Sequence, residues 1–146
     1  MQQVRSYDAY NKHCLIVEDS HHDQEMIRRA MRGARVEANL IFVSTISEAR
    51  AALKKGLFDL ILVDNSLPDG RGSDFARELA ERAGFRNTPI VIVSGWPSPF
   101  MWDKARESGL VVIDKTDQPM LSLRDMFRRF LTLPDRESDF PVRFEI

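Results

Sequence analysis

The stretch FDLILVDNSLPDG, residues 58–70, determines how the rest of the chain is interpreted. Its apolar run has no polar alternation, which predicts a central strand of a parallel sheet, buried on both faces. The strand is expected to end at Asp64, because turn-forming residues follow it: Asn65, Ser66, Pro68, Asp69 and Gly70. Asp64 then lies at the carboxyl end of a strand, where open α/β sheets place their ligand crevices. A simple turn cap is the other interpretation of this acid.

Similar apolar runs alternate with amphipathic segments along the whole chain. We expect strands at 13–17, 40–43, 59–63, 89–93 and 110–113. Capping patterns place helix starts at Ser20, Thr45, Ser73, Ser98 and either Thr116 or Asp117. Glycine and proline place the helix ends at Gly33, Gly56, Gly84, Gly109 and before Pro134.

Five strand–helix alternations predict a doubly wound α/β fold. Its five-stranded parallel sheet is expected to lie between five helices, as in a flavodoxin-like three-layer sandwich. We assign the domain to 13–133, with an N-terminal extension at 1–12 and a C-terminal tail at 134–146. A chain of 146 residues is long enough for one sizeable core.

Composition excludes several classes of function. The net charge of −1 and a pI near 6.3 give no electrostatic reason to expect nucleic-acid binding, although local basic patches remain possible. Cys14 is the only cysteine, which excludes an intramolecular disulfide and a thiolate zinc cluster. The sequence shows neither a signal-peptide pattern nor an apolar run long enough to cross a membrane. We expect a soluble, cytoplasmic protein.

Polar residues end four of the five predicted strands. Glu18 and Asp19 follow the first, Asp64 the third, Ser94 the fourth and Lys115 the fifth. Parallel strands bring their carboxyl ends to one edge, so these side chains are expected to share a crevice. Carboxylates at close quarters either hold a proton or bind a cation. Because every candidate ligand is an oxygen, the expected cation is Mg²⁺ rather than zinc.

A lysine and a hydroxyl beside such a metal complete a phosphate site, with Lys115 as the charge and Ser94 as the hydrogen-bond donor. Asp64 is the predicted nucleophile, which would form an acyl phosphate without needing a general base. The predicted metal ligands are Glu18, Asp19, Asp64 and the backbone carbonyl of Ser66.

Four motifs carry a resemblance to a known family: the acid pair in CLIVEDS, the acceptor in DLILVDNSLPDG, the hydroxyl in PIVIVSG and the lysine in VVIDK. In this order and spacing they resemble the receiver domain of two-component response regulators, typified by the chemotaxis protein CheY. The resemblance covers 13–132. It implies that Asp64 accepts a phosphoryl group from a sensor histidine kinase or a histidine phosphotransfer protein. It also implies that Glu18 and Asp19 bind Mg²⁺, and that Ser94 and Lys115 contact the phosphate.

The chain departs from the family pattern at two switch positions. Thr116 stands where the family usually has proline, so a trans peptide bond is expected there. Val112 stands where the family usually has a switching aromatic residue. We expect a partner face at Trp96, Phe100, Trp102 and Val112, which would bind a downstream protein target or form a phosphorylation-dependent homodimer.

The sequence therefore predicts a single-domain response regulator, a phosphorylation-controlled binding module that slowly hydrolyses its own acyl phosphate. It is not expected to be a turnover enzyme. The alternative is a pseudo-receiver, a phosphorylation-independent protein-interaction module, which the residues at Val112 and Thr116 favour. An aspartate-nucleophile phosphatase would require a second acid at Ser66, and is therefore disfavoured.

Overall fold

The computed structural model describes residues 11–132. Residues 1–10 of the expected N-terminal extension and the whole expected tail, 134–146, lie outside the described residues. Within the described part, no helix is both long and apolar enough to cross a lipid bilayer.

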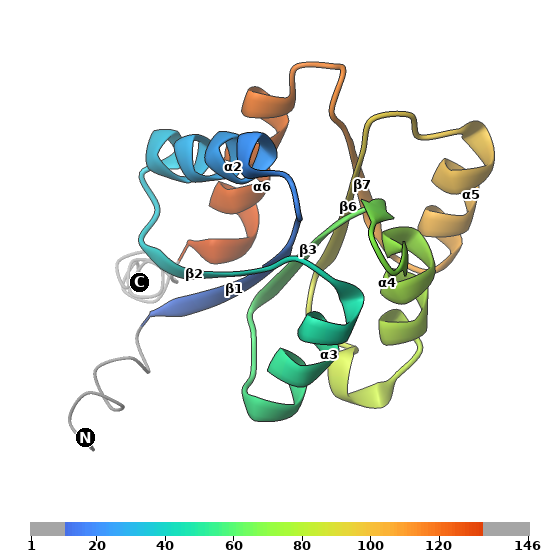
Figure 1. Cartoon of the computed structure of the whole chain (residues 1–146). Helices are drawn as coiled ribbons and strands as arrows, with labels where there is room; N and C mark the ends of the chain where they lie inside the picture. Colours follow the sequence, from blue (N-terminus) through green and yellow to red (C-terminus); the bar gives the residue numbers. More distant parts are fainter. Residues whose placement is uncertain (1–10, 133–146) are drawn as a thin grey trace, which may run out of the picture.

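Five strands form one parallel sheet in the order β2-β1-β3-β6-β7 (Figure 1). Every residue of the central strand β3 is buried, as its unbroken apolar run predicts. The strands are β1 (Lys12–Val17), β2 (Ala38–Val43), β3 (Leu60–Asp64), β6 (Ile90–Ser94) and β7 (Val111–Asp114).

Helices cover both faces of the sheet, and each face has its own apolar core. Helices α2 (His21–Ala34) and α6 (Pro119–Leu131) pack together on one face, where Phe127 is fully buried (Figure 1). Helices α3 (Ile46–Lys55), α4 (Gly72–Ala80) and α5 (Pro99–Glu107) cover the other face, where Phe75 is buried. The predicted doubly wound three-layer fold is therefore confirmed.

Three helices begin at the predicted caps. The hydroxyl of Ser20 accepts a hydrogen bond from the N–H of Asp23 at 3.2 Å. Thr45 accepts one from Glu48 at 3.0 Å, and the Glu48 carboxylate accepts one from the N–H of Ser44 at 2.7 Å. Ser98 caps α5 in the same way, with proline at the first helical position.

The end of α2 and the start of α6 differ from the prediction. Helix α2 does not end at Gly33: it continues for one residue, which buries Ala34 in the core, and Arg35 takes the left-handed conformation with φ 59°. Helix α6 is capped neither by Thr116 nor by Asp117. It begins after Gln118, which has φ 51°, because the N–H and hydroxyl of Thr116 are bound to Asp114.

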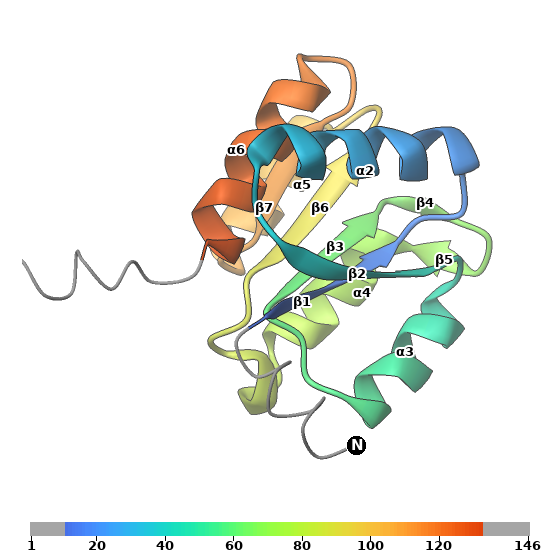
Figure 2. The same cartoon turned by 90° about the vertical axis from the view of Figure 1, so that its left-hand side faces the viewer.

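The segment after β3 also holds more structure than a turn. Residues 66–71 form a small antiparallel hairpin, β4 (Ser66–Leu67) and β5 (Gly70–Arg71), at the carboxyl end of the central strand (Figure 2). Helix α4 ends at Ala80, short of the expected Gly84, and a short 3-10 helix, Ala83–Phe85, follows it.

Candidate functional site

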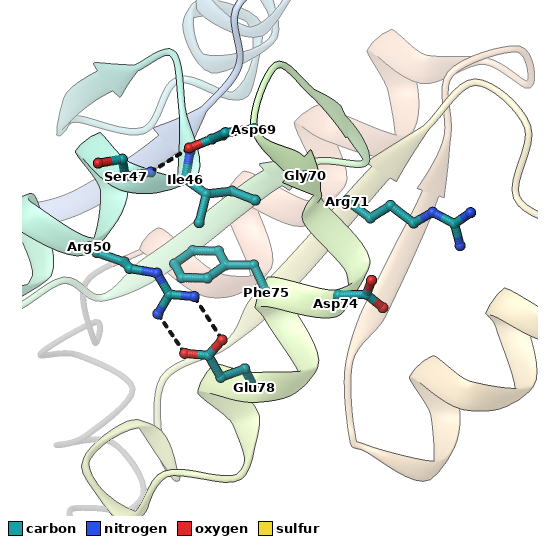
Figure 3. A pocket seen from close by; sticks show the side chains of 9 residues that line it. All are labelled: Ile46, Ser47, Arg50, Asp69, Gly70, Arg71, Asp74, Phe75 and Glu78. Carbon is teal, nitrogen blue, oxygen red and sulfur yellow. Dashed lines mark hydrogen bonds and ion pairs between the residues drawn. The ribbon is translucent and has the colours of Figure 1, made fainter.

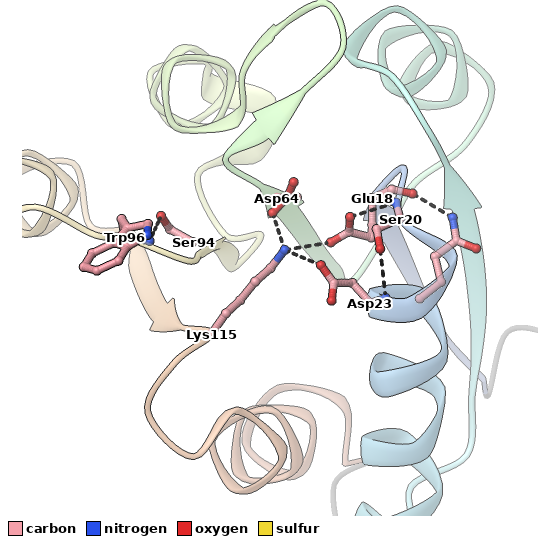
Figure 4. Close-up of polar contacts among 8 residues, drawn as sticks. Glu18, Ser20, Asp23, Asp64, Ser94, Trp96 and Lys115 are labelled. Atoms are coloured by element: carbon pink, nitrogen blue, oxygen red, sulfur yellow. Dashed lines mark hydrogen bonds and ion pairs between the residues drawn. The ribbon is translucent and has the colours of Figure 1, made fainter.

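The ammonium group of Lys115 lies among three carboxylates at the carboxyl edge of the sheet (Figure 4). Its Nζ is 2.7 Å from Oδ1 of Asp64, 2.6 Å from Oδ2 of Asp23 and 3.3 Å from Oε1 of Glu18. Asp64 and Glu18 are only 6% and 2% exposed. A partly buried positive charge thus joins the ends of β7 and β3 to the start of α2, and the predicted convergence of strand ends is found.

Hydrogen bonds fix Glu18 where β1 ends. Its N–H donates to the carbonyl of Val43 at 2.9 Å, and its carbonyl accepts from the side chain of Gln24 at 2.7 Å. Its carboxylate accepts from the N–H of Ser20 at 3.1 Å. Glu18 is therefore held by β2 on one side and by the first turn of α2 on the other.

Glu18, Asp19 and Asp64 each offer a carboxylate oxygen, and these oxygens all lie within 4.8 Å of one another. Two of these residues are buried and Asp19 is exposed, so the cluster opens to solvent on one side. An all-oxygen set with water access fits a hard cation such as Mg²⁺, which keeps several waters when bound to proteins. The donor set therefore fits the predicted metal.

The pKa values of the two buried acids and of the lysine are all raised, but for different reasons. Burial is the main cause that raises the pKa of Glu18 to about 7 and that also raises the pKa of Asp64, although Lys115 works against it in both cases. For Lys115, burial opposes the charged form. Its hydrogen bonds to Asp23 and Asp64 outweigh that cost and raise the pKa above its usual value. Lys115 is therefore fully charged at neutral pH.

The remaining predicted residues lie around this centre. The hydroxyl of Ser94 accepts a hydrogen bond from the N–H of Trp96 at 3.2 Å instead of contacting Lys115 (Figure 4). The Ser94 carbonyl accepts from the N–H of Lys115 at 2.8 Å, which ties the two loops together. Ser66 opens the hairpin two residues after Asp64. The assignment of its carbonyl to the metal stays a prediction.

The loop after Asp64 is anchored at both of its ends. The N–H groups of Gly72 and Ser73 donate to the carbonyl and side-chain oxygen of Asn65, at 2.9 and 3.0 Å. At the tip of the hairpin, the carboxylate of Asp69 accepts from the first N–H groups of α3, those of Ile46 and Ser47. The loop after Asp64 is thereby fixed to two helices.

A shallow pocket lies between α3 and α4, below this loop (Figure 3). Arg50 crosses it, with its guanidinium 4.9 Å from the centre of the Phe75 ring and paired with Glu78. Because the guanidinium of Arg50 is already paired with the carboxylate of Glu78, it is not available to bind an anionic ligand in this pocket. We interpret this group as a brace between the two helices.

The predicted partner face is largely solvent-exposed. Trp96 is 89% exposed, Phe100 67% and Trp102 38%, while Val112 is half-buried in the core beneath α5. The assignment of these residues to a partner face stays a prediction.

Asp23 is the site residue that the sequence prediction missed. Its position three residues after Ser20 indicated only a helix start, and the N–H of Asp23 does make that capping bond. The signal that could have revealed it is its place in the first turn of α2. This helix leaves the same sheet edge as Lys115, and Figure 4 shows the two side chains meeting.

Comparison with known proteins agrees with this geometry. A model of the response regulator receiver domain matches residues 14–119. The swarming motility regulation protein RssB of Serratia marcescens is 39% identical over 80 residues, which are 55% of this chain and 35% of RssB. The two-component response regulator ARR6 of Arabidopsis thaliana is 28% identical over 91 residues, 56% of this chain and 49% of ARR6. The chain thus spans less than half the length of each.

Solved structures share the fold over most of the chain. The phosphorylated cyanobacterial phytochrome response regulator RcpA aligns with a TM-score of 0.74 at 22% identity, covering 86% of this chain and 99% of RcpA. The Mn²⁺-bound form of the response regulator Rcp1 aligns with a TM-score of 0.69 at 20% identity, covering 85% of this chain and 99% of Rcp1. Since the family model covers well over half of the sequence and the fold agrees with it, the chain belongs to the response regulator receiver domain family.

Proposed function

We propose that this receiver domain, over 13–133, accepts a phosphoryl group on Asp64 from a sensor histidine kinase or a histidine phosphotransfer protein. The observation that supports this most directly is the position of Asp64. Its buried carboxylate lies 2.7 Å from the Lys115 ammonium and within 4.8 Å of the oxygens of Glu18 and Asp19. An anionic nucleophile, a cation-binding cluster and a fixed positive charge meet at one point.

The chemistry follows from this arrangement. The Asp64 carboxylate attacks the phosphorus of a phosphohistidine. An O–P bond forms, the P–N bond breaks, and the electron pair stays on the imidazole nitrogen, which takes a proton from solvent. Lys115 stabilises the negative charge on the phosphoryl oxygens. Slow attack by water on the acyl phosphate later restores Asp64. The protein acts as a phosphoacceptor and binding switch rather than a turnover enzyme.

Glu18, Asp19 and Asp64 would hold the metal, together with the carbonyl of Ser66. When bound there, Mg²⁺ would supply positive charge that offsets the negative charge of phosphoryl oxygens beside these acids. Rcp1, a protein of the same fold, has a Mn²⁺-bound form, which supports the proposal of a divalent ion.

The switch that follows phosphorylation involves Ser94 and the face next to it. The hydroxyl of Ser94 holds the N–H of Trp96, so its movement toward a phosphoryl group would release the loop that carries this exposed ring. We propose that Trp96, Phe100 and Trp102 form the surface that binds a downstream protein or a second copy after phosphorylation. Val112 contributes to the core under this face and cannot swing as an aromatic residue would.

Incubation with Mg²⁺ and acetyl phosphate, followed by intact-mass measurement, tests the proposal. We expect one phosphoryl adduct on the wild type and none on Asp64→Asn. Asp74→Asn is the matched control, because this carboxylate is 67% exposed at the start of α4 and belongs to no part of the site. It is expected to keep the adduct.

An adduct that persists in Asp64→Asn would contradict the assignment of the acceptor. The phosphorylation-independent interaction module would be favoured if no variant forms an adduct and if the tryptophan fluorescence does not change on addition of Mg²⁺ or beryllofluoride.

A further inference from the structure

Lys115 is held in place without the proline that usually follows it in the family. Thr116 stands there, and residues 11–132 contain no cis peptide bond. The backbone N–H of Lys115 is bound to Ser94, and its side chain is 18% exposed. The position of the ammonium therefore depends on the carboxylates around it.

These carboxylates fall into two groups. Asp64 and Glu18 belong to the cluster whose oxygens lie close enough together for one cation, whereas Asp23 does not. Yet Asp23 makes the shortest contact with the ammonium, at 2.6 Å. It lies in the first turn of α2, is 21% exposed, and is fixed by its N–H bond to Ser20.

Metal binding and the lysine compete for the same oxygens. A divalent ion on Glu18, Asp19 and Asp64 draws those carboxylates toward itself and repels the nearby ammonium. Asp23 is the one carboxylate bound to Lys115 that the metal does not need. A charged, flexible side chain with no such anchor would lose its fixed place beside the phosphoryl site.

We propose that Asp23 is a positioning residue: it holds the Lys115 ammonium at the pocket while Glu18, Asp19 and Asp64 bind the divalent cation. This inference rests on the proposed function and identifies what aims the lysine. The ion pair between Asp23 and Lys115 would then connect α2 to the end of β7 whenever the metal is bound.

A double-mutant cycle tests whether Asp23 acts through Lys115. Beryllofluoride affinity is measured at saturating Mg²⁺, by tryptophan fluorescence and fluorine NMR, in wild type, Asp23→Asn, Lys115→Ala and the double variant. We expect Asp23→Asn to lose about tenfold in affinity, the size of one charge-assisted hydrogen bond. In the Lys115→Ala background the same change is expected to have no further effect. Glu25→Gln is the matched control, because it removes an equal charge from the exposed side of α2.

A second measurement needs no phosphate analogue. The Nζ signal of Lys115, recorded by NMR with Mg²⁺ alone and assigned by its loss in Lys115→Arg, is expected to be protected from rapid hydrogen exchange in wild type and in Glu25→Gln. In Asp23→Asn with Mg²⁺ this protection is expected to be lost.

The outcomes separate the two proposals. If the wild type binds no beryllofluoride, the proposed function fails, and the Nζ signal alone then decides the inference. If the wild type binds, but Asp23→Asn binds equally well or more tightly, or weakens Lys115→Ala to the same extent, the positioning role is wrong. An Nζ signal that stays protected in Asp23→Asn also overturns it.

Discussion

The carbonyl oxygen of Asp64 leaves no room for a side chain at Gly72. A Cβ built there would lie 1.9 Å from that oxygen and 2.6 Å from Cγ1 of Val63. The contact arises because the first N–H of α4 must return to Asn65, which brings the helix start against the end of β3. The glycine is thus a condition for the tight loop that follows Asp64.

Gly72→Ala should therefore destabilise the protein by about 3 kcal/mol or more, since the neighbouring backbone must move. Urea unfolding followed by circular dichroism measures the loss. Gly84→Ala is the control, because a Cβ at Gly84 meets nothing within 4 Å, and it should change stability by less than about 0.5 kcal/mol. Equal stability of the two variants would show that the loop relaxes freely around a side chain at Gly72.

At the level of single residues, some contacts of the site could be predicted from the sequence and one could not. The meeting of Asp64, Glu18 and Lys115 was predictable because each lies within two residues of the end of an apolar run, and strand ends in a parallel sheet share an edge. Asp23 was missed because its contact depends on the length of the lysine side chain and the direction of α2. Neither appears in a local pattern.

At the scale of elements, the hairpin tip serves as an external cap for α3. Both carboxylate oxygens of Asp69 accept N–H groups of the first turn, at 2.8 and 3.0 Å, and these bonds lower the pKa of Asp69 below its usual value. An acid with a lowered pKa in the folded state contributes stability above its unfolded pKa, and that contribution is lost as the pH falls through the folded pKa.

Asp69→Asn keeps one acceptor oxygen and loses the charge, so it should lower the Tm by about 3 °C at neutral pH. The Tm difference from wild type should stay constant down to about pH 5 and shrink below about pH 4, as Asp69 itself becomes protonated. Thermal unfolding of both proteins over this pH range measures the Tm difference. Asp74→Asn, an exposed acid of the same pocket, should show almost no difference at any pH (Figure 3). A Tm gap that grows on acidification would contradict the assignment.

Helix starts were predictable where the deciding contact follows a capping pattern. Caps at Thr45 and Ser98 join atoms three residues apart, and both were found. The predicted end of α2 was wrong because a tertiary contact, the burial of Ala34 in the core, extends that helix by one residue. The predicted start of α6 was wrong because the N–H and hydroxyl of Thr116 are bound to Asp114, two residues earlier, and the helix begins only after Gln118.

At the scale of the whole molecule, the sheet order places the acidic cluster where the chain reverses its winding. β1 and β3 are neighbours in the sheet, and their carboxyl ends bring Glu18 and Asp64 together, with helices α2 and α4 leaving toward opposite faces. Three carboxylates at this point repel one another in the folded protein and separate on unfolding. A cation bound there should therefore stabilise the native state alone.

Millimolar Mg²⁺ should accordingly raise the free energy of unfolding, by about 2.7 kcal/mol at a concentration 100-fold above its Kd. Asp19→Asn should lose most of this gain, since Asp19 is the solvent-facing member of the cluster. Glu25→Gln should keep it. The measurement is urea unfolding with Mg²⁺, with EDTA, and with NaCl at matched ionic strength, so that screening is separated from binding. A gain reproduced by NaCl, or retained in full by Asp19→Asn, would mean that the cluster does not hold the ion.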